Sequence, residues 1–298
     1  MTQRARVWVA LSTVYVIWGS TYLFISLAVK TLHPLFAAST RFIAAGAIMS
    51  ALVVVRGGAM RTSLRSAASC LLIGILLPGA NAVLFFAERT VPTGLASLII
   101  ASVPLWLVVL RLAGHERIPW QALAGVGIGF AGVAVLAQPS GGARWWGIAL
   151  CVCSALMWSA GSFLSARLPM PANPLAATSF EMLTGGLIMF PFSVFTVHHF
   201  SPSTASIAGW IYLVTFGSIV GYTAYVWLLA NAPLGLVSTY AYVNPVVAIT
   251  LGVLFRGEHL TWRLLIGAVI VVVAVATVVR QEPTKLPELE RESAAGHG

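Results

Sequence analysis

Charged residues are scarce in this chain, and aspartate is absent. Lys, Arg, Asp and Glu make up 8% of its 298 residues, whereas an ordinary soluble domain carries roughly 25%. The eight acidic residues are all glutamates. Because so few charges cannot cover a surface exposed to water, the composition excludes a soluble globular protein. With 59% hydrophobic residues and a mean hydropathy of +0.92, the chain is predicted to be an integral membrane protein.

Motifs for cofactors, metals and familiar hydrolases are missing as well. The three cysteines, Cys70, Cys151 and Cys153, lie in apolar segments without the further ligands that a metal site needs. The sequence contains no GxxxxGK[ST], HExxH or GxSxG pattern. Residues 127–132 match GxGxxG, but no strand precedes them, and small residues in an apolar segment let helices pack closely. We therefore expect no cofactor, no metal, no ATP-driven step and no enzymatic activity.

The net charge of +9 does not indicate a nucleic-acid partner. Lys and Arg occur singly or in pairs near the ends of apolar segments, without the dense basic face of a nucleic-acid binder. Cytoplasmic loops of membrane proteins collect Lys and Arg. With the N-terminus inside, eleven of them lie near inner span ends and five near outer span ends. We therefore expect both termini in the cytoplasm.

Ten segments are apolar enough to cross a bilayer, which takes about 20 residues as a helix. They lack the alternation of barrel strands, so helices are the structure that satisfies their backbone in lipid. The predicted spans are 7–29, 35–55, 67–87, 94–113, 120–137, 146–165, 174–195, 207–230, 235–255 and 262–279. Residues 281–298 are polar and without periodicity, and are predicted to form a disordered cytoplasmic tail.

The two halves of the chain repeat one pattern. Residues 14–49 align with residues 154–189 at an offset of 140 positions, which places Trp18 on Trp158 and Pro34 on Pro174. The chain therefore divides into a first five-helix repeat, 1–139, and a second, 140–280. Because five spans is an odd number, the second repeat is expected to be inverted. Inverted repeats are typical of secondary transporters, whose substrate sites lie near the midplane between the repeats.

These features together resemble the EamA family of the drug/metabolite transporter superfamily. The resemblance rests on the duplicated ten-helix pattern, the WGS tripeptide at 18–20, Pro104 and Pro245 inside equivalent spans, and Glu116 and Glu258, each four residues before a tryptophan. It covers about residues 7–280. It implies an all-α inner-membrane carrier that exports amino acids or other small metabolites, and Pro104 and Pro245 are predicted bending points of their helices.

Two charged residues fall inside predicted spans at aligned positions. Arg41 lies about 9 Å deep from the outer face, and Glu181 about 10 Å deep from the inner face. Ionisable residues at such depths usually face a cavity or a partner. We predict that Arg41 binds a substrate carboxylate and that Glu181 binds an amine or a coupling proton. The alternatives are an Arg41 side chain that extends to the outer interface and a Glu181 that pairs with Arg41 or a hydroxyl.

Further candidate substrate-binding residues are aromatic or carry amides. Aromatic residues deep in a span need partners for their polar atoms, although core packing also explains each of them. Amides near a proline can serve a solute or the carbonyl groups that proline leaves free. The candidates are Trp18, Tyr22, Trp158, Tyr222, Tyr242, Asn81 and Asn244.

The remaining glutamates of the membrane region are expected to be structural. Glu88 and the adjacent Arg89 are predicted to pair at the outer interface. Glu116 and Glu258 precede the fifth and tenth spans, where a carboxylate suits the free amides and dipole of a helix start.

The sequence thus predicts a secondary transporter that exports a small metabolite, an amino acid or related compound, by alternating access. Its partners would be the bilayer, a small-molecule substrate and, as a candidate coupling ion, the proton. The main alternative is an exporter of lipophilic cations, in which Arg41 would be dispensable. An intramembrane enzyme is disfavoured because the histidines fall in or near loops, and a sensor because no large soluble domain is present.

Overall fold

The computed structural model describes residues 2–137, 143–197 and 200–280, and in these ranges every regular element is helical. The predicted tail, residues 281–298, lies outside the described residues. The α-helices are α1 (Gln3–Ala28), α2 (Pro34–Val55), α3 (Leu64–Ala87), α4 (Thr93–Ile100), α5 (Val103–Ala113), α6 (Trp120–Leu136), α7 (Trp145–Ser165), α8 (Pro174–Thr196), α9 (Thr204–Tyr212), α10 (Gly221–Asn231), α11 (Leu234–Val237), α12 (Tyr240–Arg256) and α13 (Trp262–Arg280). A π-helical segment, η1 (Leu213–Val220), joins α9 to α10.

The ten predicted spans are confirmed as helices. Within the described ranges, eight helical stretches are long and apolar enough to cross a membrane, and α6 and α12 are shorter apolar helices. Two of the eight are composite, because α4 and α5 together form 93–113, and α9, η1 and α10 together form 204–231. The predicted ends differ from the structure by a few residues, since α1, for example, begins at Gln3.

Local sequence explains where several helices begin and end. Pro34 and Pro174 stand at the first positions of α2 and α8, where a missing amide hydrogen costs nothing. Asn173 caps α8, its side-chain oxygen accepting from the amides of Leu175 and Ala176 at 3.0 and 3.3 Å. Gly257 ends α12 with a φ of +63°, a conformation that glycine adopts without steric cost.

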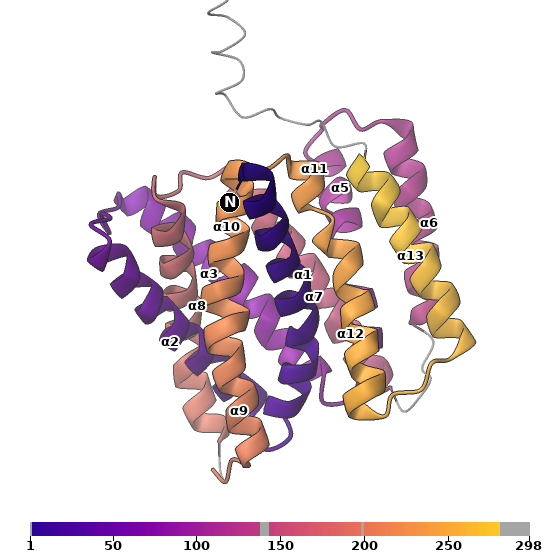
Figure 1. The fold of residues 1–298 in the computed structure, drawn as a ribbon, viewed down its shortest axis with the longest axis horizontal. Coiled ribbons are helices and arrows are strands. Elements are labelled where there is room, and N and C mark those ends of the chain that lie inside the picture. The colour runs from indigo at the N-terminus through magenta and orange to yellow at the C-terminus, as the bar shows by residue number, and fades with distance from the viewer. Residues whose placement is uncertain (1, 138–142, 198–199, 281–298) are drawn as a thin grey trace, which may run out of the picture.

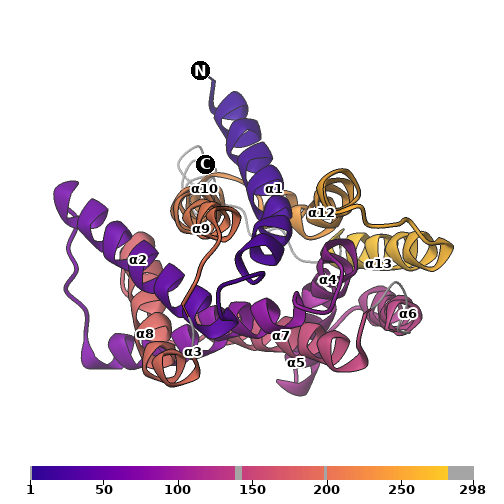
Figure 2. The same cartoon turned by 90° about the horizontal axis from the view of Figure 1, so that it is seen from below.

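Helices from the first and second halves of the chain pack directly against each other. The most extensive contact joins α2 to α8, and α6 lies against α13. Figure 2 shows these two pairs at opposite ends of the bundle, with α1, α4, α7 and α12 between them. In Figure 1, α1 crosses the middle of the bundle beside α10 and α12, both of which it contacts. Each half thus contributes helices to the centre.

Two of the predicted membrane spans are each divided into two helices. The α4 helix ends at Ile100 and α5 begins at Val103, so Pro104 falls in the first turn after the break. In the second half, α11 ends at Val237 and α12 begins at Tyr240. Pro245 therefore lies inside a continuous helix. At Pro104 the predicted interruption is present, whereas the second break precedes Pro245 by several residues.

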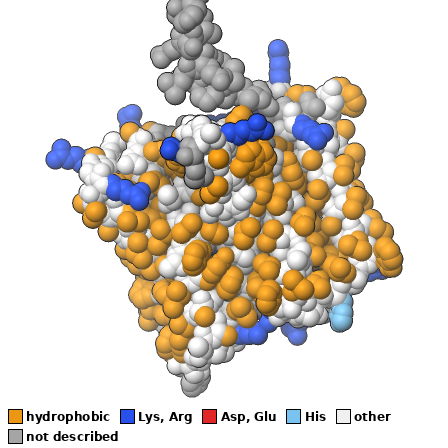
Figure 3. All heavy atoms as spheres, in the orientation of Figure 1, with side chains coloured by type: hydrophobic (Ala, Val, Ile, Leu, Met, Phe, Trp, Pro, Cys, Tyr) orange, Lys and Arg blue, Asp and Glu red, His pale blue; other side chains and the backbone are white. Residues whose placement is uncertain are grey.

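The outer surface of the bundle is apolar. Hydrophobic side chains cover the middle of the face drawn in Figure 3, while Lys and Arg gather at its upper and lower edges. Large side chains such as Phe195 and Trp262 are 79% and 81% exposed. Apolar surface of this extent is covered by another phase or partner, and the bilayer provides that cover for helices of this length.

Candidate substrate-binding cavity

A cavity of about 100 Å³ lies at the centre of the bundle. Helices α1, α2, α3, α4, α7 and α12 line it, together with the η1–α10 span and the α4–α5 break. Because an apolar cavity of about 150 Å³ holds benzene, this one fits a small group, not a drug-sized molecule. Its wall consists of Trp18, Thr21, Tyr22, Arg41, Asn81, Leu84, Ser97, Ile100, Ala101, Val103, Ser154, Trp158, Gly217, Tyr222, Tyr240, Ala241, Asn244 and Pro245.

The structure brings seven of the nine predicted site residues to this one cavity. They are Trp18, Tyr22, Arg41, Asn81, Trp158, Tyr222 and Asn244. The helices that carry them come from both halves of the chain, and both broken spans contribute to the wall. Discontinuous helices around a midplane site are a common feature of transporters, because the break leaves irregular backbone where it faces a cavity instead of lipid.

Arg41 is the charged residue of the wall. Its side chain is 3% exposed and its Nε donates a hydrogen bond to the hydroxyl of Ser218 at 3.0 Å. Its Nη1 has no hydrogen-bond partner among the described residues. No acidic side chain among the described residues forms an ion pair with Arg41. The guanidinium carbon lies 4.9 Å from the ring centroid of Phe42. The side chain therefore points into the bundle and does not extend to the outer interface.

The π-helical segment η1 makes room for this guanidinium. A Cβ atom placed on Gly217 would lie 3.3 Å from Nη2 of Arg41, and the next residue is the hydrogen-bond acceptor Ser218. One turn further, a Cβ on Gly221 would lie 2.5 Å from Nε1 of Trp18. Single-turn π-segments occur frequently at functional sites. Here η1 supplies Gly217 and the hydroxyl of Ser218 beside Arg41, and Gly221, the first residue of α10, leaves room for the Trp18 ring.

An aromatic cluster forms the side of the cavity next to Trp18. The Trp18 ring lies 5.3 Å from Tyr222, 4.9 Å from Tyr225 and 5.2 Å from Tyr240, measured between centroids. Such edge-on and tilted contacts are the preferred geometries of aromatic pairs. The cluster presents ring faces and edges close to a buried cation, so the wall combines one positive charge with several aromatic surfaces.

The amide and hydroxyl groups of the wall are largely engaged with backbone carbonyls. Asn81 donates to the carbonyl of Leu77 at 3.3 Å. With its nitrogen turned toward carbonyl groups, Asn244 donates to Tyr240 at 3.2 Å and Tyr15 at 3.3 Å. Ser154 donates to Ala80 at 2.8 Å. The carbonyl groups thus take up donors of these three side chains, whereas Nη1 of Arg41 has no hydrogen-bond partner among the described residues.

Tyr242 and Glu181 lie outside the wall. Tyr242 packs against the hydrophobic core, and Tyr240 occupies the wall position on the same helix. Residues two positions apart on a helix are rotated by about 200° around the helix axis, so these two side chains point in nearly opposite directions. Tyr240 is four residues before Asn244, and residues four apart lie on the same face of a helix. This spacing was the signal in the sequence that Tyr240 lines the cavity. Glu181 is half-buried on α8 and has the wall residue Tyr222 as an electrostatic neighbour.

Glu258 caps a helix that is distant in sequence. Its two carboxylate oxygens accept hydrogen bonds from the amides of Thr93 at 2.6 Å and Gly94 at 3.0 Å, at the start of α4. The predicted structural role at a helix start is therefore present, but on α4 and not on α13, which follows Glu258 in the chain. The tertiary fold decides this, because it brings the α12–α13 connection against the beginning of α4.

Glu116 and Glu88 also differ from their predicted surroundings. Glu116 pairs with Arg111 at 2.7 Å and with Arg167, and the Arg111 hydrogen bond lowers its pKa below the ordinary value. Glu88 does not pair with Arg89. Glu88 is buried and Arg89 is exposed, because consecutive residues at the end of a helix point about 100° apart.

Comparison with known proteins places the chain in a family. The model of the EamA-like transporter family matches residues 6–138 and again residues 145–280. The Escherichia coli (strain K12) protein described as "Uncharacterized inner membrane transporter YedA" is 36% identical over 282 residues, 90% of each chain. A "Probable terminal-alkyne amino-acid exporter" of Streptantibioticus cattleyicolor is 28% identical over 198 residues, covering 65% of this chain and 66% of that protein.

The fold also has a solved counterpart. A crystal structure with 20% sequence identity superposes with a TM-score of 0.65 and covers 92% of this chain and 96% of its own. This likeness concerns the fold alone. Because the family model matches nearly the whole chain in two consecutive segments, the chain belongs to the EamA-like transporter family.

Proposed function

We propose that this chain is a secondary transporter of the inner membrane that exports a small metabolite bearing a carboxylate, an amino acid or a closely related compound. The observation that carries the proposal is Arg41. A guanidinium that is 3% exposed and lacks an acidic partner among the described residues has exchanged its hydration for a neutral hydrogen bond to Ser218 and a contact with the Phe42 ring, without an opposite charge. A carboxylate entering the cavity would supply charge-assisted hydrogen bonds to it.

The aromatic side of the cavity suits the other end of an amino acid. An ammonium group is attracted to the face of a tryptophan or tyrosine ring, by about 0.5–2 kcal/mol depending on its desolvation. Trp18, Tyr222 and Tyr240 supply such rings in the wall that also contains Arg41. A zwitterion could therefore place its carboxylate at the guanidinium and its ammonium at the rings. The relative named as an amino-acid exporter supports this substrate class.

We further propose that segments 1–139 and 140–280 are inverted repeats that alternate access to the cavity by rocking against each other. Two observations support this arrangement. The family model matches each segment separately, and the equivalent helices α2 and α8, and α6 and α13, pack pairwise. The asymmetric distribution of Lys and Arg supports a cytoplasmic location of both termini.

An exporter of lipophilic cations is the second candidate. The aromatic cluster around Trp18 favours it, because aromatic rings bind organic cations. Two features oppose it. The buried charge of Arg41 repels a cation in the same small cavity, and the volume of about 100 Å³ is below the roughly 300–1,000 Å³ typical of drug-sized ligands.

Transport assays with reconstituted protein distinguish the two functions. Proteoliposomes would contain the wild type, Arg41→Ala, Arg41→Lys or, as a control, Arg65→Ala, whose arginine is exposed in the first turn of α3. The substrates would be a panel of radiolabelled amino acids and lipophilic cations. We expect amino-acid transport by the wild type and the control, and its loss in Arg41→Ala. Cation transport that is unaffected by Arg41→Ala would overturn the proposal and favour the second candidate.

A further inference from the structure

The carboxyl group of Glu88 is buried at the end of α3. Glu88 directly follows Ala87, the last residue of α3. Its backbone amide continues the helical pattern by donating a hydrogen bond to the carbonyl of Leu84 at 2.9 Å. The residue is 6% exposed, and neither carboxyl oxygen has a hydrogen-bond partner among the described residues. An ionised carboxylate in such a place lacks both water and a compensating donor, which makes the charged form unfavourable.

The groups around Glu88 do not favour its negative charge. Its electrostatic neighbours are Tyr22 of α1, Cys151 of α7, Glu258, and Arg256 at the end of α12. Arg256 is the cation of this set and is exposed, so solvent screens it. Glu258 accepts one amide hydrogen bond with each oxygen, the arrangement of an ionised carboxylate, and repels a second negative charge. The C-terminal end of a helix is also unfavourable for an anion.

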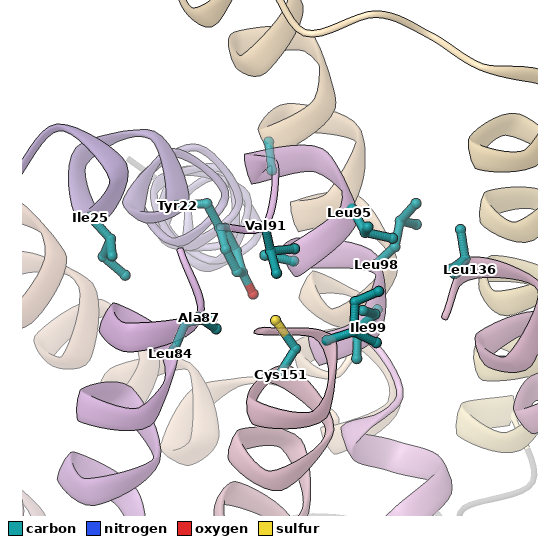
Figure 4. Close-up of a cluster of buried hydrophobic side chains, with 14 of the residues drawn as sticks. Tyr22, Ile25, Leu84, Ala87, Val91, Leu95, Leu98, Ile99, Leu136 and Cys151 are labelled. Carbon is teal, nitrogen blue, oxygen red and sulfur yellow. The ribbon is translucent and has the colours of Figure 1, made fainter. Parts of the chain in front are cut away.

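Glu88 is connected to the substrate cavity through two routes. Tyr22 both neighbours Glu88 and lines the cavity. Figure 4 shows the Tyr22 hydroxyl pointing toward Cys151, beside Ala87, the residue that precedes Glu88. The second route is Glu258, which holds the first two amides of α4, and α4 contributes Ser97 and Ile100 to the wall. A change of charge at Glu88 therefore acts on groups that shape the cavity.

We propose that Glu88 is the proton-binding carboxyl group that couples transport to a proton gradient. In the conformation described, Glu88 carries the proton and Glu258 caps α4. Loss of the proton to the water on one side of the membrane places a second negative charge next to Glu258. This charge weakens the hydrogen bonds between Glu258 and the first amides of α4. Movement of α4 then changes the cavity wall. Binding of a proton from the other side restores the cap.

This inference rests on the proposed transport function but has a readout that does not need a substrate. Infrared difference spectra of the reconstituted protein would be recorded while the pH is varied, for the wild type, Glu88→Gln and Glu181→Gln. We expect the band of a protonated carboxyl group to titrate in the wild type and in Glu181→Gln, and to be missing in Glu88→Gln. The same band in Glu88→Gln would overturn the assignment of the proton to this residue.

Transport assays test the coupling itself. Proteoliposomes loaded with a transported amino acid would be compared with and without an imposed pH gradient. For Glu88→Gln we expect loss of the gradient-driven component, while exchange with substrate on both sides continues, and Glu88→Asp should restore part of the gradient response. Gradient-driven transport that persists in Glu88→Gln would overturn the coupling role, as would accumulation that depends on sodium and ignores the pH gradient.

The two hypotheses can fail separately. If none of the amino acids is transported by the wild type, the proposed substrate class fails, while the infrared experiment still decides whether Glu88 binds a proton. If transport is observed but responds to a pH gradient equally in the wild type and Glu88→Gln, the substrate class stands and the coupling proposal falls.

Discussion

Arg41 of α2 donates a hydrogen bond from Nε to the hydroxyl of Ser218 in η1, although the two residues are 177 positions apart in the sequence. The contact joins a helix of the first half to a π-helical segment of the second. It fixes one edge of the guanidinium and leaves Nη1 without a partner among the described residues. The position of the wall's cation is thus set by both halves of the chain.

The Ser218 contact can be tested by removing its hydroxyl. Ser218→Ala should raise the KM for a carboxylate substrate, because the guanidinium loses the bond that orients it. A loss of about 1–2 kcal/mol corresponds to roughly 5- to 30-fold. Thr215→Val is a matched control in the same segment, since Thr215 bonds to its own helix at Ile211. Equal effects of both substitutions on KM would contradict the orienting role.

Gly221 is predicted to tolerate no side chain. In Gly221→Ala the new Cβ would lie 2.5 Å from Nε1 of the rigid Trp18 ring, and overpacking of this kind costs about 1–3 kcal/mol. Gly127→Ala is the control, because a Cβ there meets nothing within 4 Å and alanine favours the helix by about 0.5–1 kcal/mol. Thermal unfolding in detergent should show a lower Tm for Gly221→Ala and an unchanged or higher Tm for Gly127→Ala.

Two tyrosines of α12 have different surroundings, because Tyr240 lines the cavity and Tyr242 packs against the hydrophobic core. Tyr240→Ala should weaken substrate binding, since its ring lies in the wall beside Trp18. Tyr242→Ala should lower stability while leaving the KM nearly unchanged, because Tyr242 packs in the core. Transport kinetics and Tm would be measured for both variants. A larger KM effect for Tyr242 than for Tyr240 would show that the cavity is not the binding site.

The cap that Glu258 provides to α4 should be measurable at two amides. Glu258→Ala removes the acceptors of the Thr93 and Gly94 amide hydrogens, and loss of a cap costs about 0.5–2 kcal/mol. Hydrogen exchange should accelerate at the start of α4 and remain as in the wild type in α6, which Glu258 does not cap. Unchanged exchange at Thr93 and Gly94 would show that these bonds contribute nothing to the local stability of α4.

The cluster of Glu116, Arg111 and Arg167 should make stability depend on pH. The Arg111 hydrogen bond lowers the folded-state pKa of Glu116, and Arg167 adds to the effect. The ionised carboxylate therefore stabilises the folded state above its unfolded-state pKa, and this contribution disappears as the pH falls through the lowered pKa. The Tm difference between the wild type and Glu116→Gln should be present at neutral pH and vanish in acid. A difference that is constant with pH would refute the ionic origin.

The sequence predicted the ten helices and seven of the residues that line the cavity. Trp18 and Trp158, which occupy aligned positions in the sequence, both line the cavity. Arg41 could be chosen from the sequence because an arginine inside an apolar segment needs a cavity or a partner. Tyr240 was missed in favour of Tyr242, since depth in a span does not say which way a side chain points.

The sequence alone determined that this protein is an all-helical membrane protein with ten spans. Backbone groups in lipid must be satisfied within each segment, so apolar length dictates helices directly. The tertiary structure decided which polar groups have partners. Glu258 caps a helix that begins 165 positions before it, Ser218 meets Arg41, and Glu88 is left buried without a hydrogen-bond partner among the described residues. These outcomes depend on how distant helices pack, and local patterns of residues carry no information about such contacts.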